Sequence, residues 1–149
     1  MKLLLTGGAG YIGAHVATLA EREGHSVTIV DDLSTGIARR IASPLVDINL
    51  AAADSVEKLS TLMGETGFDA VIHLAARKQV GQSVEIPEQY FLDNIGGLAY
   101  LLLAMREHDV KKLVFSSSAA TYGMPSLDLV DEDCPGVPIN PYGQTKLVG

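Results

Sequence analysis

Short apolar runs alternate along the chain with segments whose apolar residues recur at helical spacing. The runs predict five strands, over residues 2–5, 26–30, 45–48, 70–74 and 113–116. The periodic segments predict helices over 11–23, 54–66 and 87–108, a short helical turn over 37–41, and a helix that begins near 141. Strands that alternate with helices favour an α/β fold with a doubly wound parallel sheet, whose ligands gather at the carboxyl ends of the strands.

Two of the predicted helices carry further signals. Asp54 with Glu57 is typical of a capping box, and Gly67 ends the same helix. The helix over 87–108 is apolar around nearly its whole circumference, at Tyr90, Phe91, Leu92, Ile95, Leu98, Tyr100, Leu101, Leu102, Leu103 and Met105. Such a helix has to be buried on more than one side. We therefore expect its outer face to meet another subunit, with cover by further chain as the alternative.

A glycine-rich turn separates the first strand from the first helix. Gly8, Gly10 and Gly13 match G-x-G-x-x-G, a spacing that lets the backbone turn tightly and approach a pyrophosphate closely. The free N–H groups and the positive dipole end of the following helix favour an anion at the same place. The predicted phosphate cradle consists of Gly7, Gly8, Gly10, Tyr11, Ile12 and Gly13.

The second strand ends in Asp31, about twenty residues beyond the glycines, where a carboxylate accepts hydrogen bonds from an adenosine ribose. A solvated turn acid is the alternative interpretation of Asp31 alone, but the glycine loop before it favours a dinucleotide site. Arg39 and Arg40 suggest a 2′-phosphate, which the charge of Asp31 would repel. The predicted cofactor is therefore NAD rather than NADP.

Composition narrows the class of protein. The 149 residues fit one domain, and 47% of them are hydrophobic. Eleven basic against eighteen acidic residues give a net charge of −7, which argues against nucleic acid or an anionic membrane as a partner. The apolar runs are shorter than a membrane span. The single cysteine, Cys134, has no partner for an internal disulfide, so a cytoplasmic location is expected.

Metal binding is not expected. The four histidines are His15, His25, His73 and His108, and they are scattered without the spacing of metal ligands. A hydrogen-bonded residue at a strand end is the more ordinary interpretation of His73. The acidic residues Asp128, Asp131, Glu132 and Asp133 predict a solvated loop.

Candidate catalytic residues follow the fifth strand. The strand runs into Ser116-Ser117-Ser118, and Tyr142 and Lys146 lie further on, four residues apart and so on one face of a helix. A phenol that titrates near 10 needs roughly 4 kcal/mol of preference for phenolate to act as a base near pH 7. One ammonium at roughly 5 Å supplies about 3 kcal/mol at an effective dielectric of about 20. Tyr142 is thus the predicted general base, and a serine hydroxyl the second group on the substrate oxygen.

These motifs together resemble a known family. The segments Thr6-Gly-Gly-Ala-Gly-Tyr-Ile-Gly13, His73-Leu-Ala-Ala76, Phe115-Ser-Ser-Ser118, Thr121-Tyr-Gly123 and Pro141-Tyr-Gly-Gln-Thr-Lys146 are similar to those of the extended short-chain dehydrogenases, and span the whole chain. Within that family, the stretch Arg77–Ser83 and the pair Asp47-Ile48 most resemble the 4-epimerases of UDP-glucose and UDP-galactose. The resemblance implies a Rossmann-like sheet, NAD and a UDP-sugar substrate. The homodimer is expected from the apolar helix over 87–108.

The resemblance also implies roles for residues. Asp31 and Asp32 would lie at the adenosine ribose, Asp47 and Ile48 at the adenine, and Lys78 near the pyrophosphate or ribose. Leu74, Ala75 and Ala76 would line the centre of the cofactor, with Asn94 as a wall of the pocket and Ser116, Tyr142 and Lys146 also close to it. Ser118, Tyr142 and Lys146 would be the catalytic residues. In such epimerases the tyrosine takes the proton of the sugar 4-hydroxyl as hydride passes to NAD, and the hydride returns to the other face of the 4-keto sugar.

Departures from the family pattern leave alternatives open. Members of the family continue into further strands and a smaller domain that holds the nucleotide sugar, whereas this sequence ends at Gly149. We therefore expect residues 1–149 to be the NAD-binding domain, incomplete at its carboxyl end and without the substrate domain, and inactive alone. The alternatives are another NDP-sugar dehydratase or reductase of the family, or a non-catalytic NAD-binding module.

Overall fold

In the computed structural model, which describes residues 1–126 and 129–149, five parallel strands form one sheet in the order β3-β2-β1-β4-β5. Asp128 lies outside the described residues. The strands are β1 Lys2–Thr6, β2 Ser26–Asp31, β3 Leu45–Asp47, β4 Ala70–His73 and β5 Leu113–Phe115. All four strand pairings are parallel, as the alternation of elements predicts. Because the strands are parallel, their carboxyl ends lie at one edge of the sheet. The crossover from β3 through α2 places β4 on the far side of β1.

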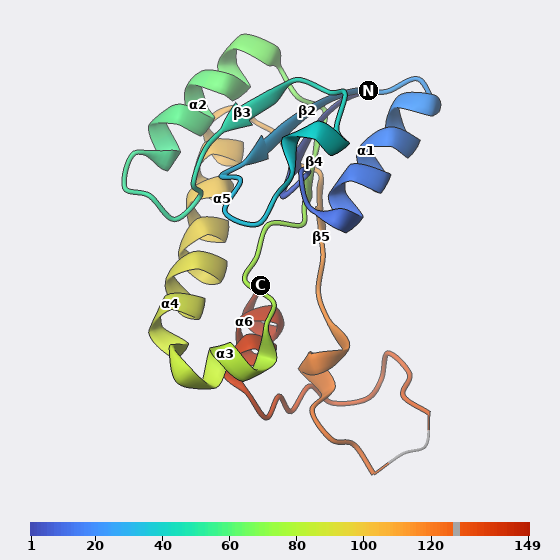
Figure 1. Ribbon diagram of the computed structural model, residues 1–149, viewed down its shortest axis with the longest axis vertical. Coiled ribbons are helices and arrows are strands. Elements are labelled where there is room, and N and C mark those ends of the chain that lie inside the picture. The colour runs from blue at the N-terminus through green and yellow to red at the C-terminus, as the bar shows by residue number, and fades with distance from the viewer. Residues whose placement is uncertain (127–128) are drawn as a thin grey trace.

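The longer helices join successive strands, while short helices and the last helix gather beyond the carboxyl edge of the sheet (Figure 1). The helices are α1 Tyr11–Arg22, α2 Ser55–Thr66, α3 Val80–Glu85, α4 Pro87–Phe91, α5 Gly97–Glu107 and α6 Pro141–Val148. Single helical turns cover Ala38–Arg40 and Ala119–Tyr122. The turn at 38–40 lies inside the predicted 37–41, whereas α3 and the turn at 119–122 were not predicted.

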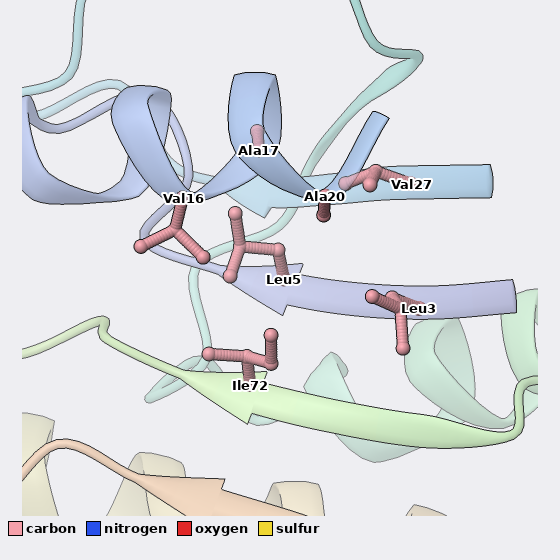
Figure 2. A pocket seen from close by; sticks show the side chains of 7 residues that line it. All are labelled: Leu3, Leu5, Val16, Ala17, Ala20, Val27 and Ile72. Carbon is pink, nitrogen blue, oxygen red and sulfur yellow. The ribbon is translucent and has the colours of Figure 1, made fainter. Parts of the chain in front are cut away.

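Helices cover both faces of the sheet (Figure 1). On one face α2 and α5 pack against β1, β2 and β4 around the buried side chains of Leu4, Leu59, Met63, Val71 and Leu101. On the other face α1 lies over β1 and β2. Figure 2 shows the seam between α1 and the strands, lined only by Leu3, Leu5, Val16, Ala17, Ala20, Val27 and Ile72. This seam offers no polar side chain, so it carries no chemistry.

The apolar residues that recur at helical spacing in α1 are Ile12, Val16, Leu19 and Ala20, and only Val16 and Ala20 pack against the sheet. Ile12 and Leu19 are 63% and 60% exposed, whereas Gly13, Ala14 and Ala17 are buried. Small side chains let the helix approach the sheet closely, so its contact face is rich in glycine and alanine rather than large residues.

The predicted capping box at the start of α2 is wrong. The Asp54 carboxylate makes no cap hydrogen bond and instead pairs with Lys58 Nζ at 2.8 Å. Its backbone has φ −91° and ψ 3°, outside the extended region from which a capping side chain reaches the following N–H groups. Gly67 does end the helix, in the left-handed conformation.

The predicted helix over 87–108 is interrupted. A π-helical turn, Leu92–Gly96, separates α4 from α5. The two sides of the apolar circumference differ as expected: Tyr90, Leu98, Leu101 and Met105 are buried, while Phe91, Leu92, Leu102 and Leu103 are 39 to 61% exposed. No helix among the described residues is long and apolar enough to cross a membrane.

Candidate active site

The glycine-rich loop has a geometry that only glycine allows. Gly7 has φ +72°, and a Cβ there would lie 2.6 Å from the backbone nitrogen of Ala75. A Cβ at Gly13 would lie 2.3 Å from the Gly7 carbonyl oxygen. The loop therefore packs directly on the end of β4 and on the first turn of α1. Gly10 is the N-cap of α1 and offers no side-chain cap, which leaves the helix start open to an anion.

Asp31 is buried at the end of β2 and holds two neighbouring loops. Its Oδ2 accepts a hydrogen bond of 2.9 Å from the Ala9 N–H, and its Oδ1 accepts one of 2.9 Å from the Leu33 N–H. Ile37 N–H donates to the Ala9 carbonyl at 2.9 Å, so the loop after β2 folds back on the glycine turn. Each carboxylate oxygen has a further lone pair for a ribose hydroxyl.

The other predicted cofactor residues surround the same edge. Asp47 ends β3 in register with Asp31 and is exposed, and Ile48 after it is buried in the core at 3% exposure. Leu74 N–H donates to the Thr6 carbonyl at 3.0 Å, which keeps the segment after β4 beside the glycine loop. That segment continues through the half-buried pair Ala75 and Ala76.

Lys78 and Asp32, also assigned to this half of the site, are solvent-exposed. Lys78 follows the end of β4 by five residues, and Asp32 binds the N–H and the hydroxyl of Ser34, at 3.0 and 2.6 Å. The Asp32 side chain therefore organises its own loop. Its predicted position near a ribose stays a prediction.

The serine cluster leaves β5 at the same edge. Ser116 N–H donates to the His73 carbonyl at 3.0 Å and continues the ladder beyond the strand. Ser118 Oγ accepts from the Ala120 N–H at 3.2 Å and so caps the turn Ala119–Tyr122. Ser117 is exposed, and its hydroxyl donates to the Lys146 carbonyl at 3.2 Å. Ser118 keeps its hydroxyl proton available to a substrate oxygen.

Tyr142 and Lys146 lie one turn apart on α6, as their spacing predicts. Asn140 Oδ1 accepts from the Gly143 N–H at 2.8 Å and caps the helix, and Pro141 occupies its first position. Lys146 Nζ donates to the Ser116 carbonyl at 2.7 Å and not to the phenol. Tyr142 is half-buried, and its hydroxyl has no hydrogen-bond partner among residues 1–126 and 129–149.

Burial lowers the pKa of the Lys146 ammonium to about 8. The side chain is only 6% exposed, and the charged form loses hydration there. At pH 7 the ammonium still predominates by about ten to one. A positive charge thus lies one helical turn from the Tyr142 phenol.

The π-turn docks α6 against the segment after β4. Asn94 is buried at 5% exposure, and its amide accepts from the Arg77 N–H at 2.8 Å and donates to the Arg77 carbonyl at 3.0 Å. The same Nδ2 donates to Thr145 Oγ1 at 2.9 Å, and Thr145 in turn donates to the Tyr142 carbonyl at 2.7 Å. These bonds make Asn94 a tether between three segments; its predicted place in a pocket wall stays a prediction.

Sequence reasoning gave Thr145 no role. Thr145 precedes Lys146 by one residue and lies on the face of α6 that the π-turn covers. The sequence alone does not show which face of α6 is covered, so it could not identify this role.

His73 is a structural residue of the strand end. Its Nδ1 lies 2.7 Å from Thr6 Oγ1, and burial, together with the charge of Lys146, lowers its pKa to about 4. The imidazole is therefore neutral at pH 7. Among the described residues no three histidine, cysteine, aspartate or glutamate side chains form a cluster suited to a metal ion.

Comparison with known proteins gives the family. Residues 3–149 match the model of the NAD dependent epimerase/dehydratase family. The chain belongs to this family. The UDP-glucose 4-epimerase of Corynebacterium glutamicum is 49% identical to it over 147 residues, which are 99% of this chain and 44% of that protein. The UDP-glucose 4-epimerase of Bacillus subtilis is 40% identical over 154 residues, which cover 99% of this chain and 45% of that protein.

Solved structures of the same family superimpose closely. The UDP-glucose 4-epimerase from Brucella ovis in complex with NAD has a TM-score of 0.94 and 40% identity, and the match covers 99% of this chain and 45% of that one. The Thermus thermophilus UDP-glucose 4-epimerase in complex with NAD has a TM-score of 0.92 and 34% identity, with coverage of 99% and 48%. The Rossmann-like fold is thereby confirmed, and the chain spans less than half the length of these relatives.

The residues of this family member fit a dinucleotide. A side chain at Gly7 or Gly13 would fill the cradle, the start of α1 is uncapped, and the Asp31 carboxylate stands at the end of the neighbouring strand. When bound, NAD would supply a hydride acceptor beside Tyr142. The residues that would hold it are those of the glycine loop, Asp31 and the segment after β4.

Proposed function

We propose that the chain is the NAD-binding, amino-terminal part of a UDP-glucose 4-epimerase that interconverts UDP-glucose and UDP-galactose through a transient 4-keto sugar. One observation carries the proposal: the glycine cradle and the Tyr142–Lys146 pair stand at the same edge of one parallel sheet. NAD supplies the hydride acceptor in this chemistry. The chain covers only 44% of the Corynebacterium glutamicum relative, and we therefore place the residues that hold the sugar nucleotide in the part that it does not cover.

The proton is handled by three side chains of this chain. The Tyr142 phenolate takes the proton of the sugar 4-hydroxyl and later returns it. The Lys146 ammonium favours the phenolate through its charge, and its anchor on the Ser116 carbonyl holds that charge in place. The Ser118 hydroxyl donates a hydrogen bond to the same substrate oxygen. Asn94 and Thr145 hold α6 in register with the strand ends.

A dehydratase or reductase of the same family is the second candidate. It would share the cofactor and the tyrosine–lysine pair, but dehydratases usually need an added acid–base pair beside the serine cluster. The serine cluster here, Ser116–Ser118, contains no carboxylate. A non-catalytic NAD-binding module would have no use for Ser118, Tyr142 and Lys146 together.

A chimera tests the proposed activity. The 149 residues are joined to the remaining carboxy-terminal part of the Corynebacterium glutamicum relative, to which they are 49% identical. We expect the chimera to convert UDP-galactose to UDP-glucose without net reduction of NAD. Proton NMR measures the conversion. A folded chimera that binds NAD and only reduces or dehydrates the sugar would replace the epimerase proposal with the second candidate.

We also propose a homodimer in the complete protein, formed by the outer apolar face of α4 and α5. Phe91, Leu92, Leu102 and Leu103 are 39 to 61% exposed on that face. Leu102→Glu places a charge in the interface and should give a monomer in sedimentation equilibrium at micromolar concentration. Arg22→Glu, at an exposed position on α1, which covers the other face of the sheet, is the control. A parent protein that is monomeric would leave this apolar face to another partner.

A cytoplasmic location stays a prediction from the single cysteine.

A further inference from the structure

Three side chains form a row across the sheet beneath Lys146. The strand register pairs Thr6 with His73 and His73 with Phe115, so the three residues occupy matching positions at the ends of β1, β4 and β5. Thr6 Oγ1 lies 2.7 Å from His73 Nδ1. The imidazole stacks on the Phe115 ring with 5.8 Å between centroids and 19° between planes. Residues in register share one face of a sheet, so the row is a continuous support.

The row ends at the Lys146 ammonium. Lys146 Nζ lies 4.8 Å from the centroid of the Phe115 ring and 2.7 Å from the Ser116 carbonyl oxygen. A cation within about 6 Å of a ring face is attracted by the ring quadrupole, and the attraction is greater where water is excluded. Lys146 is 6% exposed. The ring and the carbonyl are therefore the contacts that offset the lost hydration of this charge.

We propose that Phe115 is a positioning residue, whose ring face holds the Lys146 ammonium charged and in place, with a neutral His73 as the support behind the ring. The contact itself is independent of turnover, and only its catalytic meaning rests on the proposed function. Through Lys146, the ring of Phe115 would help to set the charge that acts on Tyr142.

No carboxylate offers an alternative explanation for the charge of Lys146. Among the described residues, its ammonium makes no ion pair. The titratable groups on the elements packed against it and on its own helix are His73, Glu85, Glu88, Tyr90, Asp93, Tyr122, Tyr142 and the terminal carboxylate of Gly149. Asp93 is bound by Arg77 and Gln89, and the Tyr90 hydroxyl by Gln79 and Gln82. The pKa of His73, lowered to about 4 by burial and by the charge of Lys146, keeps a second positive charge away.

The test measures the pKa of Lys146 in the 149-residue chain by NMR of the lysine ε-carbon. The signal is assigned by its loss in Lys146→Met. Phe115→Leu keeps an apolar side chain but removes the ring, so we expect the pKa of Lys146 to fall by about 0.5 to 1.5 units. Phe115→Tyr keeps the ring face and should leave that pKa unchanged. An unchanged pKa in a folded Phe115→Leu chain would overturn the proposal.

A second measurement serves if Phe115→Leu does not fold. Phe68, Phe91 and Phe115 are the three phenylalanines of the chain, and all are replaced by phenylalanine with one, two or three ring fluorines. Fluorine weakens the quadrupole with little change in shape, so the pKa of Lys146 should fall stepwise. A flat series would refute the contact. A chimera without epimerase activity would refute the proposed function and leave this pKa result standing.

Discussion

The glycine loop and the Tyr142 helix lie at one edge of the sheet, yet contacts of different range hold them. The loop is held partly within one strand–helix–strand unit, where Asp31 reaches Ala9 across 22 positions of sequence, and partly by its close approach to Ala75 after β4. The helix α6 depends on distant segments: Asn94 binds Thr145 across 51 positions, and Lys146 binds the Ser116 carbonyl across 30. The proposed cofactor half thus rests in part on a local unit, whereas the helix of the proposed catalytic half is positioned by distant segments.

The largest expected effect comes from a substitution that removes catalysis and leaves NAD binding intact. Tyr142→Phe removes the proton acceptor and keeps the ring, so turnover of the chimera should fall at least about a hundredfold while NAD still binds. Tyr100→Phe on α5 is the matched control and should keep full activity. Steady-state kinetics with calorimetry of NAD separates the two halves. Near-normal epimerisation by Tyr142→Phe would remove the tyrosine from the mechanism.

The second prediction breaks the cofactor half. Gly7→Ala forces a left-handed backbone on alanine and drives its Cβ to 2.6 Å from the Ala75 nitrogen, so it should destabilise the chain by about 2 to 4 kcal/mol and abolish NAD binding. Gly24→Ala is the control, because Gly24 also has a positive φ but open space around its Cβ position. Its cost should be about 1 kcal/mol. Equal losses in urea unfolding would mean that the close approach of the loop to Ala75 is unimportant.

The third prediction uses pH to isolate the buried ammonium. Folding lowers the pKa of Lys146 from 10.5 to about 8, so between these values the unfolded chain binds the proton and the folded chain does not. Stability should therefore rise with pH over this window, by up to about 3 kcal/mol. Lys146→Met should remove the rise, whereas Lys111→Met, at an exposed ion pair, should keep it. A rise of equal size in Lys146→Met would contradict the burial of the charge.

The same difference in range explains what the sequence could predict. The glycine loop, Asp31 and the parallel sheet depend on local patterns, and the structure agrees with them. The spacing of Tyr142 and Lys146 predicted one helical face correctly. The pattern could not reveal that Lys146 binds the carbonyl of Ser116 beyond β5 and lies over Phe115, because those contacts exist only after the sheet is assembled.

The errors have physical causes of the same kind. The capping box at Asp54 failed because the exposed carboxylate meets Lys58 instead of the helix N–H groups. The π-turn over Leu92–Gly96 leaves the apolar periodicity nearly unchanged, so the sequence pattern does not indicate it. The bonds that Asn94 makes from this turn to Arg77 appear only in the structure. In α1 the apolar spacing is correct for Val16 and Ala20 but not for the exposed Ile12 and Leu19, because close packing on the sheet selects glycine and alanine.

The central claim is that these 149 residues contain a complete dinucleotide site, and calorimetric titration of the chain with NAD and then NADP tests it most directly. Because the Asp31 carboxylate repels a 2′-phosphate, we predict one NAD per chain, bound at least about tenfold more tightly than NADP. Asp31→Asn should reduce that preference. A folded chain that binds no NAD, or that binds NADP equally well, would contradict the claim.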